Sequence, residues 1–425
     1  MIATKEQFGK IESVEDLLGR AFREQQTLTA VERYAQKHEA GTIPAQARYY
    51  ADLMPATPPR PGEQYAFEVD LDRCTSCKAC VTACHNLNGL EPGETWRSTG
   101  LLIGGEAERS FQQTVTTACH HCAEPACLKG CPVQAYEKDA VTGIVRHLDD
   151  QCIGCKYCQL TCPYDVPKYS KSKGIVRKCD MCSSRLSAGE APACVQACPN
   201  QAIRIRTVSL EHIEGRSATH AVVPGAPSSR WTQPTTTYKT SRPLPENAKP
   251  ADEHVKEPAH IPLVIMLVLS QLSVGMCLFG VNVLAATVVG ALSMAAAMFH
   301  LGRPQYAFRA LLGLKTSWLS REILAFGVYM ASMAATMLWP PLAALALAAG
   351  LTGVFASVMV YGVTGRPSWT IGKTALRFFG ATVILGAAAA YSPLGLAAAL
   401  VGVFAERYFF FTNGARPKMP GGPGR

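Results

Sequence analysis

The sequence predicts an α+β cysteine-rich domain followed by an all-α transmembrane bundle of about six helices. Sixteen of the seventeen cysteines lie between Cys74 and Cys198, in four groups of four. The chain is polar up to about residue 250, whereas the part from Ile261 onward is rich in Ala, Leu, Val and Gly. Apolar stretches of about 20 residues, the length that spans a bilayer, recur in this second part. A soluble half and a membrane half explain this distribution better than one globule does.

The cysteine groups follow the run that bacterial ferredoxins use for iron–sulfur clusters. In chain order they are Cys74, Cys77, Cys80, Cys84, Cys119, Cys122, Cys127, Cys131, Cys152, Cys155, Cys158, Cys162, Cys179, Cys182, Cys194 and Cys198. Proline follows Cys131, Cys162 and Cys198. In such a run three closely spaced thiolates hold one [4Fe–4S] cube, and the fourth ligates the partner cube. The spacing therefore predicts four [4Fe–4S] clusters in a double bacterial-ferredoxin-like domain.

Disulfides, structural zinc and unliganded thiols compete with iron–sulfur ligation. Sixteen cysteines fit a disulfide framework by parity, but such a framework has no reason to repeat Cys-x-x-Cys four times. Structural zinc usually takes two separated Cys-x-x-Cys pairs rather than a run ending in Cys-Pro. Buried unliganded thiols have no reason to cluster at all. Iron–sulfur clusters explain the spacing best, and so many thiols favour assembly in a reducing compartment.

Five segments are expected: an N-terminal helical arm (1–61), a four-cluster domain (62–206), a linker (207–258), a transmembrane anchor (259–413) and a cytoplasmic tail (414–425). In the arm, Val14, Leu17, Leu18 and Phe22 recur at helical spacing. Charges such as Lys5 interrupt any apolar core there, so no signal peptide is expected. The arm either packs on the cluster domain or docks another subunit.

Within the cluster domain, residues 65–69, 143–147 and 202–206 are predicted strands, and small helices are expected after the Cys-Pro turns. Basic residues lie close to the cysteines in the sequence: Lys78, Lys129, Lys156, Lys168, Arg177, Lys178 and Arg185. Their positive charge would favour the reduced, more negative state of the clusters. The alternative is that they form an ordinary solvated surface. His120 and His121 adjoin Cys122. Because the cysteine count is already complete, both histidines are expected to pack beside the clusters rather than to ligate iron.

The anchor is predicted from six apolar stretches, at residues 261–281, 283–300, 321–340, 342–363, 374–391 and 393–412. Basic residues gather in the loops on one side: Arg303, Arg309, Lys315, Arg321, Arg366, Lys373, Arg416 and Lys418. The turns on the other side carry none, so the positive-inside rule places the cluster domain in the cytoplasm, at the inner membrane. These loops also explain part of the net charge of +9, and no nucleic-acid motif accompanies it.

A second informative stretch surrounds two ionisable residues at the membrane boundary. His300 ends one predicted span and Glu322 begins the next, both on the cluster side. A quinol gives up two protons with its two electrons, and an imidazole and a carboxylate at this boundary could take them. Arg309, Trp318 and Arg321 are further candidates for a quinone pocket. Interfacial anchoring is the alternative role for Trp318, Arg321 and the nearby Tyr306.

These residues resemble a known family. The cysteine spacing is similar to that of the electron-transfer subunit of the dimethyl sulfoxide reductase group of molybdenum enzymes. Four motifs in the second half resemble its membrane anchor: His300-Leu-Gly, Trp318-Leu-Ser-Arg-Glu-Ile, Tyr361 and Arg366-Pro-x-x-Trp369. The resemblance covers roughly residues 62–206 and 260–412, so the chain looks like both subunits fused.

The resemblance implies how the cysteines share clusters. The implied sets are Cys74, Cys77, Cys80 with Cys198; Cys179, Cys182, Cys194 with Cys84; Cys119, Cys122, Cys127 with Cys162; and Cys152, Cys155, Cys158 with Cys131, nearest the membrane. Nitrate-reductase relatives carry tryptophan at the position of Cys155, so its presence here implies a full cube. His300 and Glu322 match the family's quinol-site residues. This chain departs from the family pattern in two ways. Six spans are predicted, where the family anchor normally has eight. The cluster domain is also predicted on the cytoplasmic side, whereas the best-known members hold their clusters on the outer side.

The resemblance implies an electron-transfer and anchor subunit that relays electrons between the quinone pool and a separate molybdopterin catalytic subunit. No dinucleotide or phosphate-loop motif is present in the chain. One alternative is a module of a hydrogenase-linked or ion-translocating redox complex. Another is a haem-b quinol oxidase arm, for which the membrane half offers only His260 and His300 as axial ligands.

Overall fold

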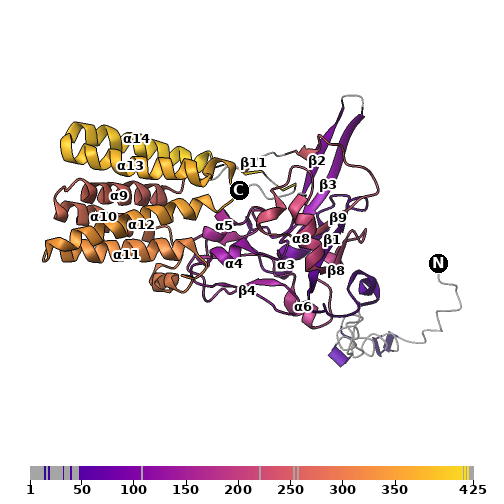
Figure 1. The fold of residues 1–425 in the computed structure, drawn as a ribbon. Helices are drawn as coiled ribbons and strands as arrows, with labels where there is room; N and C mark the ends of the chain where they lie inside the picture. The colour runs from indigo at the N-terminus through magenta and orange to yellow at the C-terminus, as the bar shows by residue number, and fades with distance from the viewer. Residues whose placement is uncertain are drawn as a thin grey trace.

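A computed structural model of the protein describes residues 14–15, 18–19, 32, 39–40, 47–106, 109–219, 222–251, 254–255, 258–414, 416–417 and 419–420. Figure 1 shows strands and short helices gathered at one end of a bundle of long helices. This architecture confirms the predicted fold class, an α+β domain followed by an all-α bundle. Most of the expected N-terminal arm and C-terminal tail lies outside the described residues.

The cluster domain is built on two three-stranded sheets and several short hairpins. Its strands, with the C-terminal pair, are β1 (Glu63–Asp70), β2 (Ser98–Glu106), β3 (Arg109–Thr117), β4 (Tyr136–Lys138), β5 (Val145–His147), β6 (Lys168–Ser170), β7 (Ile175–Arg177), β8 (Ile203–Ser209), β9 (Thr237–Lys239), β10 (Lys249–Pro250), β11 (His254–Val255) and β12 (Arg416–Pro417). One sheet has the order β8-β1-β9 and the other β10-β2-β3. Because β9 and β10 come from the segment expected to be a linker, that segment extends both sheets.

Short helices precede the three Cys-Pro steps. They are α4 (Ala126–Gly130), α5 (Tyr157–Thr161) and α7 (Ala193–Gln196). The other short helices of this domain are α3 (Ala79–Leu87), α6 (Ser183–Ser187) and, after the last step, α8 (Leu210–Thr219). Helices α4 and α5 end at Cys131 and Cys162, which are both extended. The expectation that small helices follow the Cys-Pro turns is therefore wrong. The reason is that a residue before proline is pushed out of the helical region, so each helix stops there.

Six helices form the anchor, within a few residues of the six predicted stretches. They are α9 (Ile261–Leu278), α10 (Val283–Met298), α11 (Trp318–Thr336), α12 (Ala343–Gly362), α13 (Ile371–Tyr391) and α14 (Pro393–Thr412). Four of the described helices are long and apolar enough to cross a membrane: α9, α12 with its preceding turn, α13 and α14. Helix α10 is apolar but shorter, and α11 carries Arg321 and Glu322 near its start.

Helix α5 belongs to both parts of the molecule. Its Tyr157 and Leu160 are buried in one core with Phe326 and Val358 of the anchor. The Tyr157 hydroxyl donates a hydrogen bond of 2.7 Å to the carbonyl oxygen of Val360. Since α5 also carries Cys158, the cysteine set to which that residue belongs lies directly against the helical bundle.

The loop between α10 and α11 fixes the anchor to the cluster domain through glycines. A Cβ atom on Gly302 would overlap the carbonyl oxygen of Gly174, and one on Gly154 would lie 2.9 Å from the Gly302 backbone. The Arg303 amide donates to the Ile153 carbonyl oxygen over 3.0 Å, and Ser317 Oγ donates to that of Gly130 over 2.7 Å. Backbones approach this closely only where side chains are missing.

Candidate functional site

Two of the four implied cysteine sets each surround a small cavity. One cavity, of about 20 Å³, is lined by cysteines of the first and fourth groups: Cys74, Cys77, Cys80 and Cys198. The other, also of about 20 Å³, is lined by cysteines of the second and third groups: Cys119, Cys122, Cys127 and Cys162. In the described part of the chain, no three Cys, His, Asp or Glu side chains lie close enough to hold a single metal ion. The cysteines instead face one another across these cavities.

The remaining two sets are also brought together. Cys84 lies near Cys182 and Cys194, and Cys179 lies near Cys84. The fourth set shares one core: Cys131, Cys152, Cys155 and Cys158. Each implied set of four is thus a spatial group in the structure.

The backbone around the cysteines donates hydrogen bonds to sulfur. Within the Cys-x-x-Cys loops, the backbone amide two residues after a cysteine donates to its thiol, as the Met181 amide does to Cys179 Sγ over 3.4 Å. After two Cys-Pro turns the chain folds back. The Ala135 amide then donates to Cys131 Sγ over 3.2 Å, and the Ala202 amide donates to Cys198 Sγ over 3.3 Å. Such bonds stabilise negative charge on sulfur and help to set cluster potentials.

Several of the buried thiols would keep their protons without a metal. Burial, with the charge of neighbouring thiolates, raises the pKa of Cys84 to about 12. Burial likewise raises the pKa of Cys131 and Cys182 to about 11. At neutral pH these groups would keep their protons, so iron must displace them. A set of four sulfur donors around a small cavity fits a [4Fe–4S] cube.

Two buried cations lie between the cysteine sets. Arg97 is 2% exposed, and its charge acts on Cys80 and Cys84, which belong to two different sets. Lys178 is also 2% exposed; despite burial, which lowers its pKa, the neighbouring Cys119, Cys127 and Cys179 thiolates raise it overall. Lys178 was among the cations singled out in the sequence, whereas Arg97 was missed because it lies outside any cysteine run.

The two histidines next to Cys122 are buried packing residues. The ring of His120 contacts that of Tyr164 edge-on at 4.5 Å, and burial lowers the pKa of His120 to about 3. His121 Nδ1 accepts a hydrogen bond from the Val145 amide over 3.1 Å. Both rings are therefore neutral and packed in the core, and His120 also lines the cavity of Cys119, Cys122, Cys127 and Cys162.

A cavity of about 220 Å³ joins the membrane-side cysteine set to the two ionisable residues of the anchor. Cys155 of the cluster domain lines it together with His300 and Glu322. Tyr157 and Tyr361 complete a mainly apolar wall. A cysteine, an imidazole and a carboxylate thus border one space at the junction of the two parts.

The two ionisable residues are held firmly in this cavity. Glu322 is 4% exposed, near the start of α11, and Ser357 Oγ of α12 donates a hydrogen bond to its Oε1. His300 is 8% exposed and is hydrogen-bonded to the backbone of Cys155. Its ring meets that of His260 edge-on at 5.4 Å. The two rings pack directly on each other in this structure, with no gap between them for a haem.

The other three quinone-pocket candidates lie outside the cavity. Arg309 donates to the carbonyl oxygen of Asp150 over 2.9 Å. Arg321 donates to the Leu314 carbonyl oxygen over 3.1 Å and lies over the ring of Trp318 at 4.5 Å. Arg309 and Arg321 therefore fasten the loop between α10 and α11, and Trp318 faces a different cavity.

Sequence reasoning missed several residues of the site. Tyr157 lies within the third cysteine run, between Cys155 and Cys158, but the run draws attention only to its cysteines. Ser357 comes from a distant part of the chain and stands in no ionisable or cysteine motif. A buried polar group was missed as well. Arg407 is fully buried; its Nη2 donates to Gln271 Oε1 over 2.9 Å, and its Nη1 is bonded to Glu406. The available signal was an arginine inside an otherwise apolar span.

Comparison with known protein families gives two matches. A model described as a 4Fe-4S dicluster domain matches residues 111–208. A model described as the DMSO reductase anchor subunit (DmsC) matches residues 280–405. The first covers three of the four cysteine groups, and the second covers His300 and Glu322.

Three relatives are similar to the cluster part. The B subunit of anaerobic dimethyl sulfoxide reductase from Haemophilus influenzae is 36% identical over 189 residues, 42% of this chain and 91% of that protein. The probable anaerobic dimethyl sulfoxide reductase subunit YnfG of Escherichia coli is 36% identical over 41% of this chain and 88% of its own length. The hydrogenase-2 operon protein HybA of Escherichia coli is 33% identical over 38% of this chain and 56% of its own length.

Proposed function

Because this protein belongs to the dimethyl sulfoxide reductase family, as an iron–sulfur electron-transfer subunit fused to a membrane anchor, we propose that it relays electrons between membrane quinone and a separate molybdopterin catalytic subunit. The relay uses four [4Fe–4S] clusters, one in each cysteine set. The observation that carries this proposal is the shared cavity of Cys155, His300 and Glu322. Quinone bound there would lie against the cysteine set nearest the membrane.

The cavity suits the head of a quinone. It has a volume of about 220 Å³ and an apolar wall, which suits the quinone ring. The isoprenoid tail would stay in the lipid. Oxidation of a quinol to a quinone releases two electrons and two protons. Glu322 accepts one proton, and Ser357 holds its carboxylate in place by donating to Oε1. His300 holds or protonates the other oxygen.

The cysteine sets hold the clusters, which supply reversible one-electron storage. Tight burial of Cys131, Cys152 and Cys158 keeps water from the end of the relay near the anchor. At the opposite end Cys77 is exposed, so that set lies close to a surface that a catalytic subunit can cover. The amide and cation contacts described above keep the buried sulfur charge stable in between.

The anchor is proposed to cross the inner membrane six times with the cluster domain on the cytoplasmic side. Met419, which follows the last anchor helix, is buried in the core of the cluster domain. The chain therefore returns to the side of the cluster domain after α14, which supports an even number of crossings. Several arginines of the basic loops also fasten the two parts, as Arg303 does by donating to the Asp149 carbonyl oxygen over 3.0 Å. Their charge still favours retention on the cytoplasmic side.

A second candidate is a module of a hydrogenase-linked complex. It is favoured by the similarity to the hydrogenase-2 operon protein HybA, which covers the cluster part alone. The metal of the catalytic partner distinguishes the two candidates. Molybdenum in the co-purified partner supports the first proposal, and nickel with no molybdenum supports the second.

Substitution of the two ionisable residues tests the quinone site. Glu322→Gln keeps size and hydrogen bonding but removes the proton acceptor, so quinol-linked turnover should fall roughly 10²–10⁴-fold. His300→Gln should lower turnover in the same assay. Iron content, membrane insertion and turnover with dyes that reduce the clusters directly should be unchanged.

Glu211→Gln is the control, because Glu211 is an exposed carboxylate of α8 that does not line the cavity. It should leave quinol turnover near the wild-type rate. Unchanged quinol turnover in both Glu322→Gln and His300→Gln would remove the site from this cavity.

A further inference from the structure

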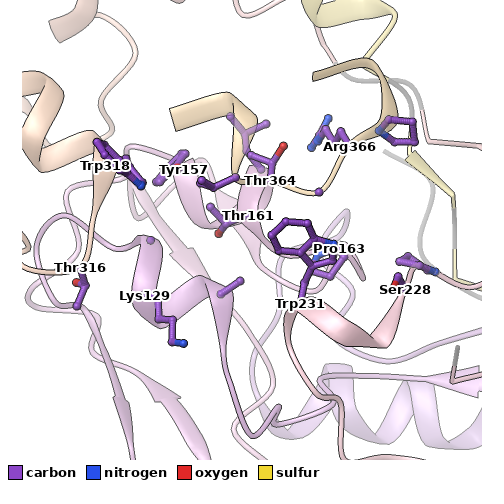
Figure 2. A pocket seen from close by; sticks show the side chains of 17 residues that line it. Lys129, Tyr157, Thr161, Pro163, Ser228, Trp231, Thr316, Trp318, Thr364 and Arg366 are labelled. Carbon is purple, nitrogen blue, oxygen red and sulfur yellow. The ribbon is translucent and has the colours of Figure 1, made fainter. Parts of the chain in front are cut away.

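A larger cavity at the same junction has no part in the proposed electron transfer. It has a volume of about 510 Å³ and lies between α4 and α5 of the cluster domain and the ends of two anchor helices. In Figure 2, Trp318, Thr316 and Lys129 lie on one side of the view and Trp231 and Arg366 on the other. The segments that border this cavity come from distant parts of the chain.

The cavity lies at the level of the membrane surface. Trp318 is the first residue of α11, and residues 363–367 follow directly after the end of α12. Both helix ends face the cluster domain. A tryptophan that is 60% exposed, Trp231, reaches this level from the cluster-domain side. Tryptophans at such a boundary are typical of the zone where lipid headgroups meet acyl chains.

The wall of this cavity is apolar with a positive charge. Most of the lining is carbon, from residues such as Leu160, Pro163 and Val363. The charged residues that line it are Lys129 and Arg366, and none of the described lining residues is acidic. An apolar surface with cations at its edge complements an amphiphile that carries a negative head.

The two cations are presented differently. Arg366 is 3% exposed and held in place: its Nη1 donates to the Gly414 carbonyl oxygen over 2.8 Å, and its guanidinium lies 4.3 Å from the Trp369 ring centre. Lys129 is exposed and ion-paired with Glu124, whose side chain is also exposed. An exposed pair contributes little free energy, so Lys129 is available to a competing anion.

We propose that this cavity binds the headgroup of an anionic phospholipid, with the phosphate drawn to Lys129 and Arg366 and the acyl chains passing Trp318 into the bilayer. The lipid braces the cluster domain on the anchor. Tyr157 and Leu160 line this cavity and also the cavity of His300, so the lipid lies behind one wall of that site. The inference needs only the membrane location and is independent of the proposed quinone chemistry.

Lipid binding is measured directly on the full-length protein, with its partner subunit if that co-purifies. The delipidated protein is placed in nanodiscs with phosphatidylglycerol or phosphatidylethanolamine, and retained lipid is counted by native mass spectrometry. We expect preferential retention of phosphatidylglycerol. Lys129→Gln should weaken that binding roughly fivefold, the effect of one basic residue near an anionic headgroup. Thr316→Trp, at the exposed rim, should block the cavity and abolish it.

Lys315→Gln is the matched control for Lys129→Gln, because Lys315 is an exposed lysine beside Thr316 that does not line the cavity. It should retain phosphatidylglycerol as the wild type does. Equal retention of both lipids by the wild type would overturn the proposal. Equal effects of Lys129→Gln and Lys315→Gln, or undiminished binding in Thr316→Trp, would also overturn it.

Discussion

At the scale of single residues, a buried arginine links two cysteine sets. The Arg97 guanidinium lies over the ring of Phe67 at 4.6 Å and donates to Thr116 Oγ1 over 3.4 Å. That hydroxyl lies 3.7 Å from Cys80 Sγ. A cation with 2% exposure costs desolvation, which the negative sulfurs around it offset. We therefore expect Arg97 to stabilise the reduced state of the clusters proposed for these two cysteine sets.

Removing this charge should lower cluster potentials. Arg97→Gln is expected to lower the reduction potential of at least one cluster by roughly 60 mV, a tenfold change in a one-electron equilibrium. Arg97→Lys keeps the charge and should shift the potential less. Redox titrations followed by electron paramagnetic resonance measure both. Unchanged potentials in an Arg97→Gln protein with full iron content would show that Arg97 only packs.

Asp72 gives a pH dependence at the same scale. Hydrogen bonds from the Ser241 amide (2.6 Å), from the Ser241 hydroxyl and from the Thr240 hydroxyl (2.9 Å) lower the pKa of this carboxyl. Because the pKa of Asp72 is lower in the folded than in the unfolded state, its charged form stabilises the fold at every pH above the unfolded pKa of about 3.9. This stabilisation is lost as the pH falls from there through the folded pKa.

Hydrogen exchange at Ser241 tests this assignment. Wild-type protection should be equal at pH 7 and pH 4, whereas Asp72→Asn should exchange faster at both, because the amide has one acceptor oxygen in place of two and carries no charge. Loss of wild-type protection already at pH 4 would contradict the lowered pKa.

At the scale of elements, the loop after α10 depends on three glycines. Gly154 and Gly174 have φ angles of +68° and +67°, and both meet the backbone of Gly302. Nearby, a Cβ on Gly313 would lie 2.7 Å from the Cys131 carbonyl oxygen. The His300-Leu-Gly motif thus fixes the distance between the anchor and the membrane-side cysteine set.

A methyl group at Gly302 should separate the two parts. Gly302→Ala is expected to destabilise the protein by roughly 1–3 kcal/mol, the usual cost of overpacking. It should also speed proteolysis of the loop between α10 and α11. Gly327→Ala is the control, since a Cβ on Gly327 has no atom of the described chain within 4 Å. Equal stability of the two variants would show that the glycine contact is not needed.

Much of the element structure could be predicted from the sequence, because cysteine spacing and apolar length are local signals. The strands at 65–69 and 202–206 and the six anchor helices agree with the structure. The helices before Cys-Pro were misplaced, since the effect of proline on the preceding residue was overlooked. Strands β9 and β10 were missed because each is very short and is fixed by its partner strand.

At the scale of the whole molecule, the candidate site forms only when the two parts dock. His300 and Glu322 could be found from the sequence, as ionisable residues at the ends of apolar stretches. That they share a cavity with Cys155 could not, because it depends on α5 packing into the anchor core. Arg309 and Arg321 carried the same sequence signal, yet their hydrogen bonds hold the loop instead.

The central claim is that quinol delivers electrons to the clusters through the cavity of Cys155. The direct measurement is rapid-freeze electron paramagnetic resonance of the oxidised, anaerobic protein mixed with quinol, after a check for about sixteen irons per chain. The account predicts that quinol reduces the clusters of the wild type and of Ala331→Trp, which changes an exposed alanine of α11. It predicts no reduction by quinol in Ala297→Trp, which fills the cavity, although dithionite still reduces every cluster. Reduction of Ala297→Trp by quinol at the wild-type rate would contradict it.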